Sequence, residues 1–247
     1  MKNTLIFFLQ KLLGFNNYLF VFALFTYYRL RTNKKEKDFF KIFDLIEGDG
    51  IILDIGANIG VMTAHFAKNK KNSLVYSFEP VPENIRALKR VVRYFKLKNV
   101  KIMENALSDF DGEIDMLMPK EKRAKKQGLS HVVNENDKNN EEGSLYRVPV
   151  KKLDNISELA NSDTKIKAIK IDVEGHEFKV LQGAKNILQK NKPVVYCELW
   201  NTSQRGEVIK FMESLNYKTK VVEKNVLCDF KNQLTQNFFF VNSEELS

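Results

Sequence analysis

The chain has 247 residues, of which 43% are hydrophobic and 29% charged. This composition excludes a disordered protein and suits one domain with a substantial core. The net charge is +9, but the lysines are scattered and no nucleic-acid-binding motif accompanies them, so we expect no nucleic-acid partner.

Metal and disulfide chemistry are also not indicated. The two cysteines, Cys197 and Cys228, cannot form a disulfide framework, and the three histidines lack the spacing of zinc ligands. A Mg²⁺ ion held by Asp172, Glu174 and Glu198 is an alternative that we rank lower. We therefore predict no bound metal.

Residues 1–37 form an apolar N-terminal segment that we expect to be helical. Its apolar runs, 5–9 and 18–25, are both shorter than the ~20 residues needed to span a bilayer. Two interpretations stay open. We favour helices that pack on the domain; the alternative is peripheral membrane contact through residues 1–35, with basic side chains near the lipid headgroups. In either case we expect a cytoplasmic location, with membrane association in the second.

Residues 38–247 have the alternating pattern of an α/β domain. The first half predicts helices near 38–48, 59–69 and 82–97, and strands near 51–55, 73–78, 100–106 and 113–117. The second half predicts strands near 146–150, 166–172, 193–198, 218–222 and 236–241, and helices near 176–184 and 203–215. Such alternation favours a parallel sheet with helices on both faces.

A polar stretch, 119–145, interrupts this pattern and contains one apolar island, 128–133. Loops of this length in compact domains are usually functional or disordered. We interpret the island as a lid or substrate contact, with Ser130 and His131 as candidate substrate residues; an ordinary solvated insertion is the alternative.

The turn after strand 51–55 indicates which ligand the domain binds. Asp54 is followed by Gly56 and Gly60, with Asn58 where a dinucleotide site carries its middle glycine. A carboxylate here would repel a pyrophosphate and attract an ammonium group. The turn therefore favours S-adenosylmethionine (SAM) over NAD. Glu79, at the end of the next strand, is placed to accept the hydroxyls of a ribose.

Further acids follow the later strands. Asp172 and Glu198 come at predicted strand ends, and parallel strands would bring them to the same edge of the sheet as Asp54 and Glu79. We take Asp172 as the first candidate for a base or acceptor-orienting acid, and His131 or His176 as the second. Lys170 lies on the same strand face as Asp172, and a structural ion pair between them is the alternative. Glu198 is assigned to the acceptor.

Four motifs, at 54–60, 78–84, 106–108 and 170–177, resemble those of the FkbM-type SAM-dependent methyltransferases. The resemblance implies a class I methyltransferase fold: an α/β, Rossmann-like, mostly parallel seven-stranded sheet with helices on both faces and a final antiparallel strand. It also implies a SAM-dependent O-methyltransferase that acts on a hydroxyl of a sugar, glycan or similar metabolite. A non-catalytic SAM-binding or membrane-associated protein is one alternative, and an NAD-linked oxidoreductase is a weaker one.

The resemblance assigns roles by position within a methyltransferase domain at 38–247. The cofactor-binding residues would be Asp54, Gly56, Asn58, Gly60, Glu79, Pro80, Asn105, Ala106 and Leu107. The catalytic group would comprise Lys170, Asp172, Glu174 and His176. No oligomeric state is predicted.

Overall fold

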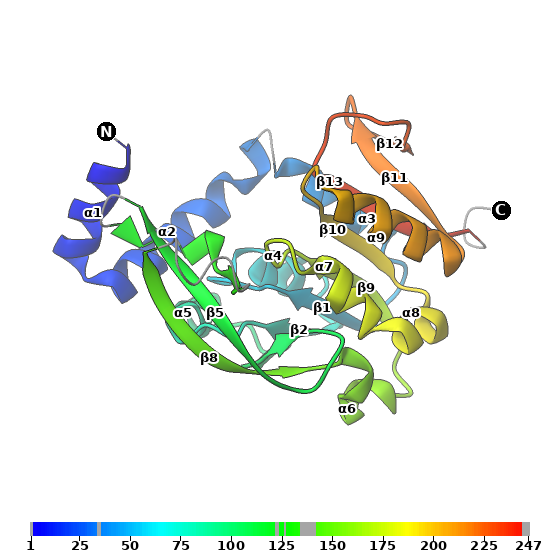
Figure 1. The fold of residues 1–247 in the computed structure, drawn as a ribbon, viewed down its shortest axis with the longest axis horizontal. Coiled ribbons are helices and arrows are strands. Elements are labelled where there is room, and N and C mark those ends of the chain that lie inside the picture. The colour runs from blue at the N-terminus through cyan, green and yellow to red at the C-terminus, as the bar shows by residue number, and fades with distance from the viewer. Residues whose placement is uncertain (1, 34–35, 122–123, 126, 134–141, 244–247) are drawn as a thin grey trace.

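The computed structural model describes residues 2–33, 36–121, 124–125, 127–133 and 142–243. Its main sheet has eight strands in the order β12-β11-β13-β10-β9-β1-β2-β3 (Figure 1). The strands are β1 Ile51–Ile55, β2 Leu74–Phe78, β3 Val100–Met103, β9 Ile166–Ile171, β10 Val194–Glu198, β11 Tyr217–Glu223, β12 Val226–Asp229 and β13 Asn237–Asn242.

The direction of the strands confirms the expected fold class. Strands β3, β2, β1, β9 and β10 are parallel to one another, and β13 is antiparallel to both of its neighbours, β10 and β11. The sheet differs from the expected seven strands by β12, which pairs with β11 across a hairpin. Because β1, β9 and β10 are parallel, their carboxyl ends meet at one edge, where ligands bind in such sheets.

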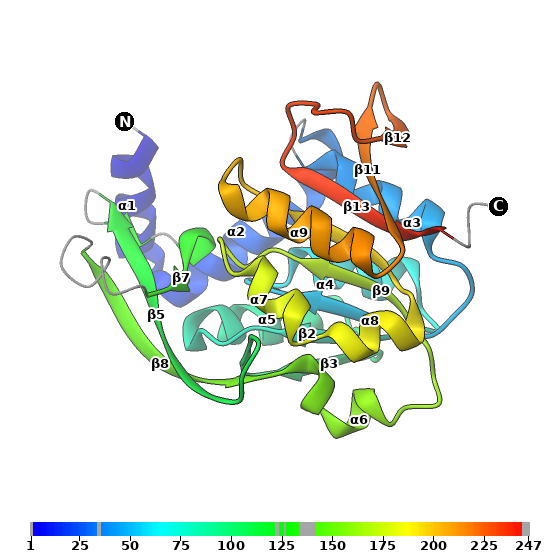
Figure 2. The ribbon, with the colours of Figure 1, turned by 45° about the vertical axis from the view of Figure 1, so that its right-hand side comes forward.

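Helices cover both faces of the sheet (Figure 2). One face packs against α7 Glu177–Gln182, α8 Lys185–Asn191 and α9 Ser203–Ser214, through core residues such as Val180, Leu188 and Met212. The other packs against α2 Phe15–Arg29, α4 Val61–Asn69 and α5 Pro82–Tyr94. Side chains alternate along β1, so Leu53 joins the first core and Ile52 the second.

A second, smaller sheet stands beside the first. It contains β4 Ala106–Leu107, β5 Gly112–Glu121, β6 Ala124–Lys125, β7 His131–Val132 and β8 Gly143–Lys151. The strand predicted at 113–117 therefore belongs to a long antiparallel pair with β8, in register from Gly112↔Val150 to Pro119↔Gly143, and not to the parallel sheet. The reason is local: the Asp111–Gly112 turn sends the chain away from the main sheet before a helix can form.

Short helical segments complete the connections. They are η1 Leu30–Thr32, η2 Lys37–Lys41, α3 Ile42–Leu45, η3 Gln127–Leu129, η5 Leu153–Asn155 and α6 Ser157–Ala160. Segments η2 and α3 occupy the place of the helix predicted at 38–48, with Phe39 and Ile42 fully buried.

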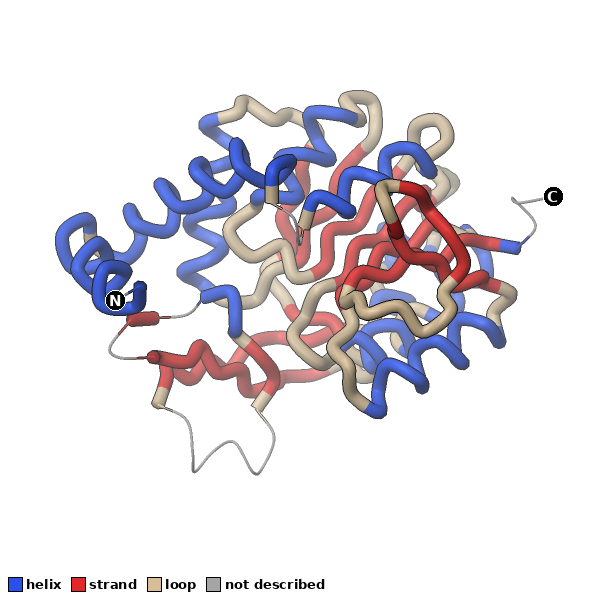
Figure 3. Tube along the Cα trace, turned by 90° about the horizontal axis from the view of Figure 1, so that it is seen from above, coloured by secondary structure: helices blue, strands red, loops and turns tan. Residues whose placement is uncertain are grey.

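The N-terminal segment is helical, as expected. Helix α1, Lys2–Leu13, meets α2 at Gly14, whose φ of 71° allows the sharp change of direction. Leu19 and Ala23 of α2 are buried in the core formed with α4 and α5. From above, the two helices extend from the body of the domain (Figure 3).

No single helix in the described part of the chain is long and apolar enough to cross a membrane. Only Ile6–Leu13 and Phe15–Thr32 taken together reach that length and composition, and they are bent by 118° relative to each other.

Candidate cofactor and acceptor site

The turn between β1 and α4 forms the floor of the site. Gly56, Asn58 and Gly60 all have positive φ, at 72°, 50° and 85°. Asn58 thus stands in the left-handed region, which asparagine tolerates better than most residues, and this explains why it can replace a glycine. A side chain on Gly60 would lie 2.5 Å from Leu88, so this glycine also permits close packing of α4 on α5.

Glu79 lies at the centre of a hydrogen-bond network next to this turn. Its carboxylate accepts bonds from the backbone N–H of Asn58 at 2.8 Å and of Val81 at 2.9 Å, and from the Asn84 side-chain amide at 3.1 Å. Burial raises the pKa of Glu79 to about 7, against the opposing effect of these donors. The carboxyl group is therefore held in one orientation beside the turn.

Asp54 and Lys170 lie beneath the turn and are almost fully buried. Asp54 accepts a hydrogen bond from the Thr63 hydroxyl at 2.5 Å, and its other oxygen lies 3.4 Å from Lys170 Nζ. Lys170 donates to the carbonyl oxygens of Ile55 and Gly56 at 3.3 and 2.8 Å. Burial acts to lower the pKa of Lys170, but Asp54 and Asp172 together raise it, so the ammonium remains charged.

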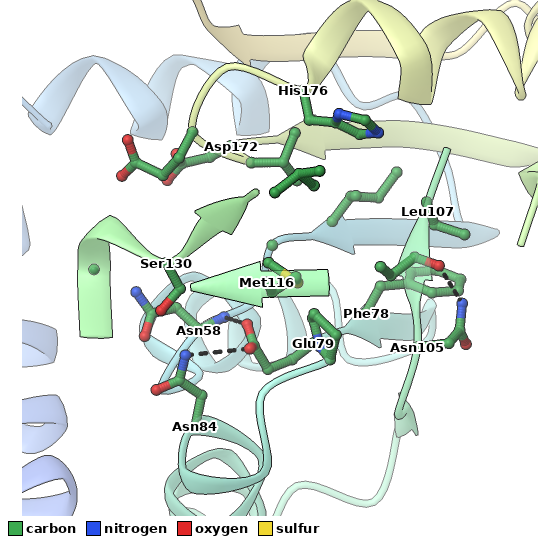
Figure 4. Close-up of a pocket in the computed structure, with 18 residues that line it drawn as sticks. Asn58, Phe78, Glu79, Asn84, Asn105, Leu107, Met116, Ser130, Asp172 and His176 are labelled. Atoms are coloured by element: carbon green, nitrogen blue, oxygen red, sulfur yellow. Dashed lines mark hydrogen bonds between the residues drawn. The ribbon is translucent and has the colours of Figure 1, made fainter. Parts of the chain in front are cut away.

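A cavity that opens to solvent lies above this turn (Figure 4). Asp172 and His176 lie on one side, and Asn58, Glu79 and Asn84 on the other. The residues that line it are Ile55, Gly56, Asn58, Phe78, Glu79, Pro80, Asn84, Asn105, Ala106, Leu107, Met116, Gly128, Ser130, Val132, Asp172, Val173, Glu174 and His176.

Two buried acceptors in this cavity have no hydrogen-bond donor among the described residues: the side-chain oxygens of Asn58 and Asn84. Each such group costs free energy unless a ligand or water bonds it. These two oxygens therefore favour a ligand that carries hydroxyl or amine donors.

Acidic side chains interact with Asp172, which lines the cavity. Burial, followed by repulsion from Asp172 and Glu198, raises the pKa of Glu174 to about 8. Burial and Asp172 likewise raise the pKa of Glu198 to about 7. The pKa of Glu36 is raised too, first by burial and then by Asp172, with Lys170 acting in the opposite direction. The excess of carboxyl groups over this one lysine favours a cationic ligand.

His176 is oriented by a chain of polar contacts. Its Nε2 lies 2.8 Å from the Ser108 hydroxyl, which donates to Asp109 at 3.2 Å, and Lys179 pairs with Asp109 at 2.7 Å. With the Ser108 proton directed toward Asp109, Nε2–H donates to Ser108, and Nδ1 is then the nitrogen able to accept a proton. Burial lowers the pKa of His176, so the ring is neutral at pH 7.

The structure separates the predicted site residues into two sets. Those that line the cavity are Gly56, Asn58, Glu79, Pro80, Asn105, Ala106, Leu107, Ser130, Asp172, Glu174 and His176. Those that do not are Asp54, Gly60, Lys170, His131 and Glu198. Asp54 and Lys170 lie beneath the turn that forms the floor of the cavity and contact the turn instead of the cavity. His131 forms a hydrogen bond with the Leu129 carbonyl at 2.9 Å.

Sequence reasoning missed several lining residues. Asn84 was recoverable, since it sits in the first turn of a helix that starts directly after Glu79–Pro80. Met116 and Val132 come from β5 and β7 of the second sheet, whose position over the cavity no local pattern indicates. The apolar island was the available signal, and its Gly128, Ser130 and Val132 do line the cavity.

A second hollow opens beside the first, with Glu174 contributing to both. It is lined by Gly175, Glu177, Leu199, Trp200, Thr202, Gln204 and Arg205, from the loops that follow β9 and β10 and from the first turns of α7 and α9. The Trp200 ring is 46% exposed. The exposed indole gives this hollow a flat apolar surface and an N–H donor.

The comparisons with known proteins agree with this geometry. A family model described as the methyltransferase FkbM domain matches residues 54–219, more than half of the chain. The chain belongs to the FkbM methyltransferase family. This confirms the predicted resemblance and enzyme class, with SAM as the methyl donor of this FkbM domain.

Individual relatives of this FkbM chain are distant. "Methyltransferase 1" of Beauveria bassiana is 26% identical over 55% of the chain and 58% of its own length. "Hexuronic acid methyltransferase AglP" of Haloferax volcanii is 27% identical over 85% of the chain and 81% of its own length. A crystal structure of methyltransferase FkbM from Methylobacillus flagellatus KT matches the fold with a TM-score of 0.51 at 16% identity, covering 78% of this chain and 43% of that one.

The cavity fits SAM in its chemistry. Glu79 can accept hydrogen bonds from ribose hydroxyls. The amide oxygens of Asn58 and Asn84 have no donor among the described residues and can accept hydrogen bonds from SAM. Phe78 and Met116 offer apolar surface for a purine. The nearby excess of acidic groups suits a ligand that carries sulfonium and ammonium charges.

No group of three or more His, Cys, Asp or Glu side chains suited to a metal ion occurs within the described ranges. The absence of a metal remains a prediction, as do the individual roles assigned to the site residues.

Proposed function

We propose that this FkbM methyltransferase transfers a methyl group from SAM to a hydroxyl group of a sugar. The named relative from Haloferax volcanii, which aligns over most of both chains, supports this acceptor class. SAM supplies an electrophilic methyl group when it is bound; the protein must position the acceptor and remove its proton.

The observation that carries the proposal is that Glu174 lines both hollows. An acceptor that occupies the hollow with Trp200 would bring its hydroxyl to this carboxyl group, at the boundary with the cofactor cavity. The pKa of Glu174, raised to about 8 by burial and by its acidic neighbours, is close to the working pH, as suits a proton acceptor. A bound cation would lower that pKa and favour the carboxylate.

Asp172 has a supporting role in this proposal. It lines the cofactor cavity and lies 3.7 Å from Lys170, so its charge is partly balanced. The sequence analysis named Asp172 as the first candidate base, with His131 or His176 as the second. In this proposal Asp172 is the first alternative to Glu174, and the neutral His176 is the second.

Trp200 provides the acceptor platform. The C–H face of a sugar ring is apolar, and an exposed indole offers a flat apolar surface together with an N–H donor. Thr202 and Gln204, beside it, add polar groups for hydroxyls.

The test uses purified protein with methyl-labelled SAM and a panel of acceptors: hexuronic acids, neutral hexoses, and phenols as non-sugar controls. We expect label to enter a sugar, and Glu174→Gln to reduce turnover by roughly 10²–10⁴-fold, the usual share of a general base, with SAM binding retained. Glu207→Gln, an exposed acid on α9, is the matched control. Label in phenols alone would refute the sugar assignment. Full turnover in Glu174→Gln would transfer the base role to Asp172 or His176.

The alternatives make different predictions. Membership of the FkbM methyltransferase family removes the reason to expect an NAD-linked oxidoreductase. A non-catalytic SAM-binding protein would bind SAM and never consume it, whichever acceptor is offered.

A further inference from the structure

Helix α2 carries apolar side chains on both of its faces. Tyr18, Leu19 and Ala23 point into the core, as in any surface helix. The outer face should then be polar. Instead, Val21, Phe25 and Tyr28 follow one another at helical spacing and are 52%, 54% and 66% exposed.

Helix α1 also exposes large apolar side chains. Phe8 and Leu12, four residues apart, are 60% and 81% exposed. Large apolar side chains exposed in a row on two consecutive helices are costly in water and mark an interaction surface. We call the outer residues Phe8, Leu12, Val21, Phe25 and Tyr28 the outer apolar face.

The sequence that carries this face is basic. The first 35 residues contain six lysines and arginines and no acidic residue. Arg29 lies over the Phe25 ring at 5.1 Å. Such a cation beside an exposed aromatic ring is suited to the headgroup level of a membrane, where long basic side chains reach phosphate while their stems stay on apolar surface.

Helix α5 extends this surface. The Tyr28 ring contacts Phe95 at 6.5 Å, and Phe95 contacts Tyr94 at 5.0 Å, so the exposed tyrosines of the two helices are neighbours. A shallow hollow at this end of α5 combines apolar and basic side chains: Val92, Leu97 and Ile102 with Lys89, Arg93, Lys96 and Lys98. Tyrosines at the interface and basic groups around them are the composition of a membrane-binding surface.

We propose that the outer apolar face of α1 and α2, with the basic end of α5, docks this enzyme on an anionic lipid membrane. The occupant is argued from charge: a water-soluble protein partner would need an acidic and apolar surface of matching shape, whereas an anionic bilayer supplies both properties at once.

The test is co-sedimentation of the full chain with vesicles of phosphatidylcholine alone or with phosphatidylglycerol at one part in three. We expect binding to the anionic vesicles that weakens with added salt, and little binding to the neutral ones. The double variant Val21→Asn/Phe25→Asn should bind at least about tenfold more weakly, because about two apolar side chains leave the lipid phase.

Matched controls separate docking from general effects. Leu234→Asn and Val226→Asn change apolar residues that are 100% and 64% exposed elsewhere, and should bind vesicles like the unchanged protein. Thermal midpoint and SAM binding of the α2 variant should also be unchanged, because both side chains are outside the core.

Two results would overturn the proposal. One is equal vesicle binding by the α2 variant and the unchanged protein. The other is a dimer in solution, measured by light scattering, that the α2 variant converts to a monomer, which would assign the face to a second copy of the chain.

Discussion

The ammonium nitrogen of Lys170 lies 2.8 Å from the carbonyl oxygen of Gly56, so the motif on β9 is bonded directly to the glycine turn on β1. The same nitrogen balances the negative charge of Asp54, which lies beneath the turn. In this arrangement Lys170 and Asp54 form a buried clamp beneath the cofactor cavity. The catalytic role of Lys170 and the binding of the SAM ammonium group by Asp54 remain predictions. The clamp gives both residues a structural role that does not depend on them.

Loss of the lysine should therefore destabilise the fold and disorder the turn. Lys170→Met leaves Asp54 as a buried charge without its cation, which typically costs about 3–5 kcal/mol. We expect a lower thermal midpoint and weaker SAM binding by calorimetry. Arg147→Met, in an exposed pair with Glu113, should cost about 0–1 kcal/mol. Adding Asp54→Asn to Lys170→Met should recover part of the loss; a further additive loss would argue against the clamp.

Gly56 should not tolerate a side chain. Its φ is 72°, and a methyl group there would overlap the carbonyl oxygen of Asp172. Gly56→Ala must push β9 away from the turn, so we expect SAM to bind more weakly and turnover to fall by about a hundredfold, as a displacement of about 1 Å can cause. Gly206→Ala in α9, where nothing lies within 4 Å, is the control and should gain up to about 1 kcal/mol. Normal SAM binding by Gly56→Ala would show that the turn can shift freely.

Glu79 should contribute to SAM affinity through its charge. Glu79→Gln keeps the size of the side chain but replaces one acceptor oxygen by a donor, which faces either the N–H of Asn58 or the donors of Val81 and Asn84. Hydrogen bonds to charged groups contribute about 1.5–3 kcal/mol, so SAM should bind roughly 10- to 150-fold more weakly. Glu104→Gln, an exposed acid paired with Lys89, serves as the control. Equal loss in both variants would mean that net charge, and not Glu79, sets the affinity.

The stability of the cofactor-free protein should fall as the pH rises from about 6.5 to 8. In the fold the pKa of Glu174 is about 8 and that of Glu198 about 7, above the ordinary value near 4.5. The folded state therefore holds protons in this interval that the unfolded state has already released, and its stability decreases with pH. The lowered pKa of His65, about 4, affects stability only below pH 6.5.

Thermal unfolding at constant ionic strength measures this effect. Glu174→Gln cannot ionise, so its midpoint should depend less on pH and should exceed that of the unchanged protein at pH 8. Parallel pH profiles for the two proteins would contradict the raised pKa of Glu174.

The parallel half of the fold could be predicted because its strands are short apolar runs that end in polar residues. Strands β1 and β10 lie within one residue of their predicted ranges, since burial on both faces leaves an unambiguous sequence signal. Strand β12 was not predicted. Its hairpin turns at Lys224 and Asn225, which both have positive φ. Asn225 was the sequence signal for this turn, because asparagine tolerates positive φ better than most residues.

The remainder depends on contacts between distant segments. The alternation in 113–117 identified a strand, but strand periodicity does not say which sheet the strand joins. In the same way, the acids at the strand ends indicated the ligand edge, while the burial of Asp54 beneath it depends on Thr63 and Lys170, which fold onto it from α4 and β9.

The crowding of Glu36, Asp172, Glu174 and Glu198 has a consequence for the end of the reaction cycle. Methyl transfer turns a sulfonium into an uncharged thioether, so the spent donor has one positive charge fewer than the fresh one. A site with surplus negative charge retains the spent molecule less firmly. Product inhibition should accordingly be weak at low ionic strength and should grow relative to donor binding as salt screens the carboxylates.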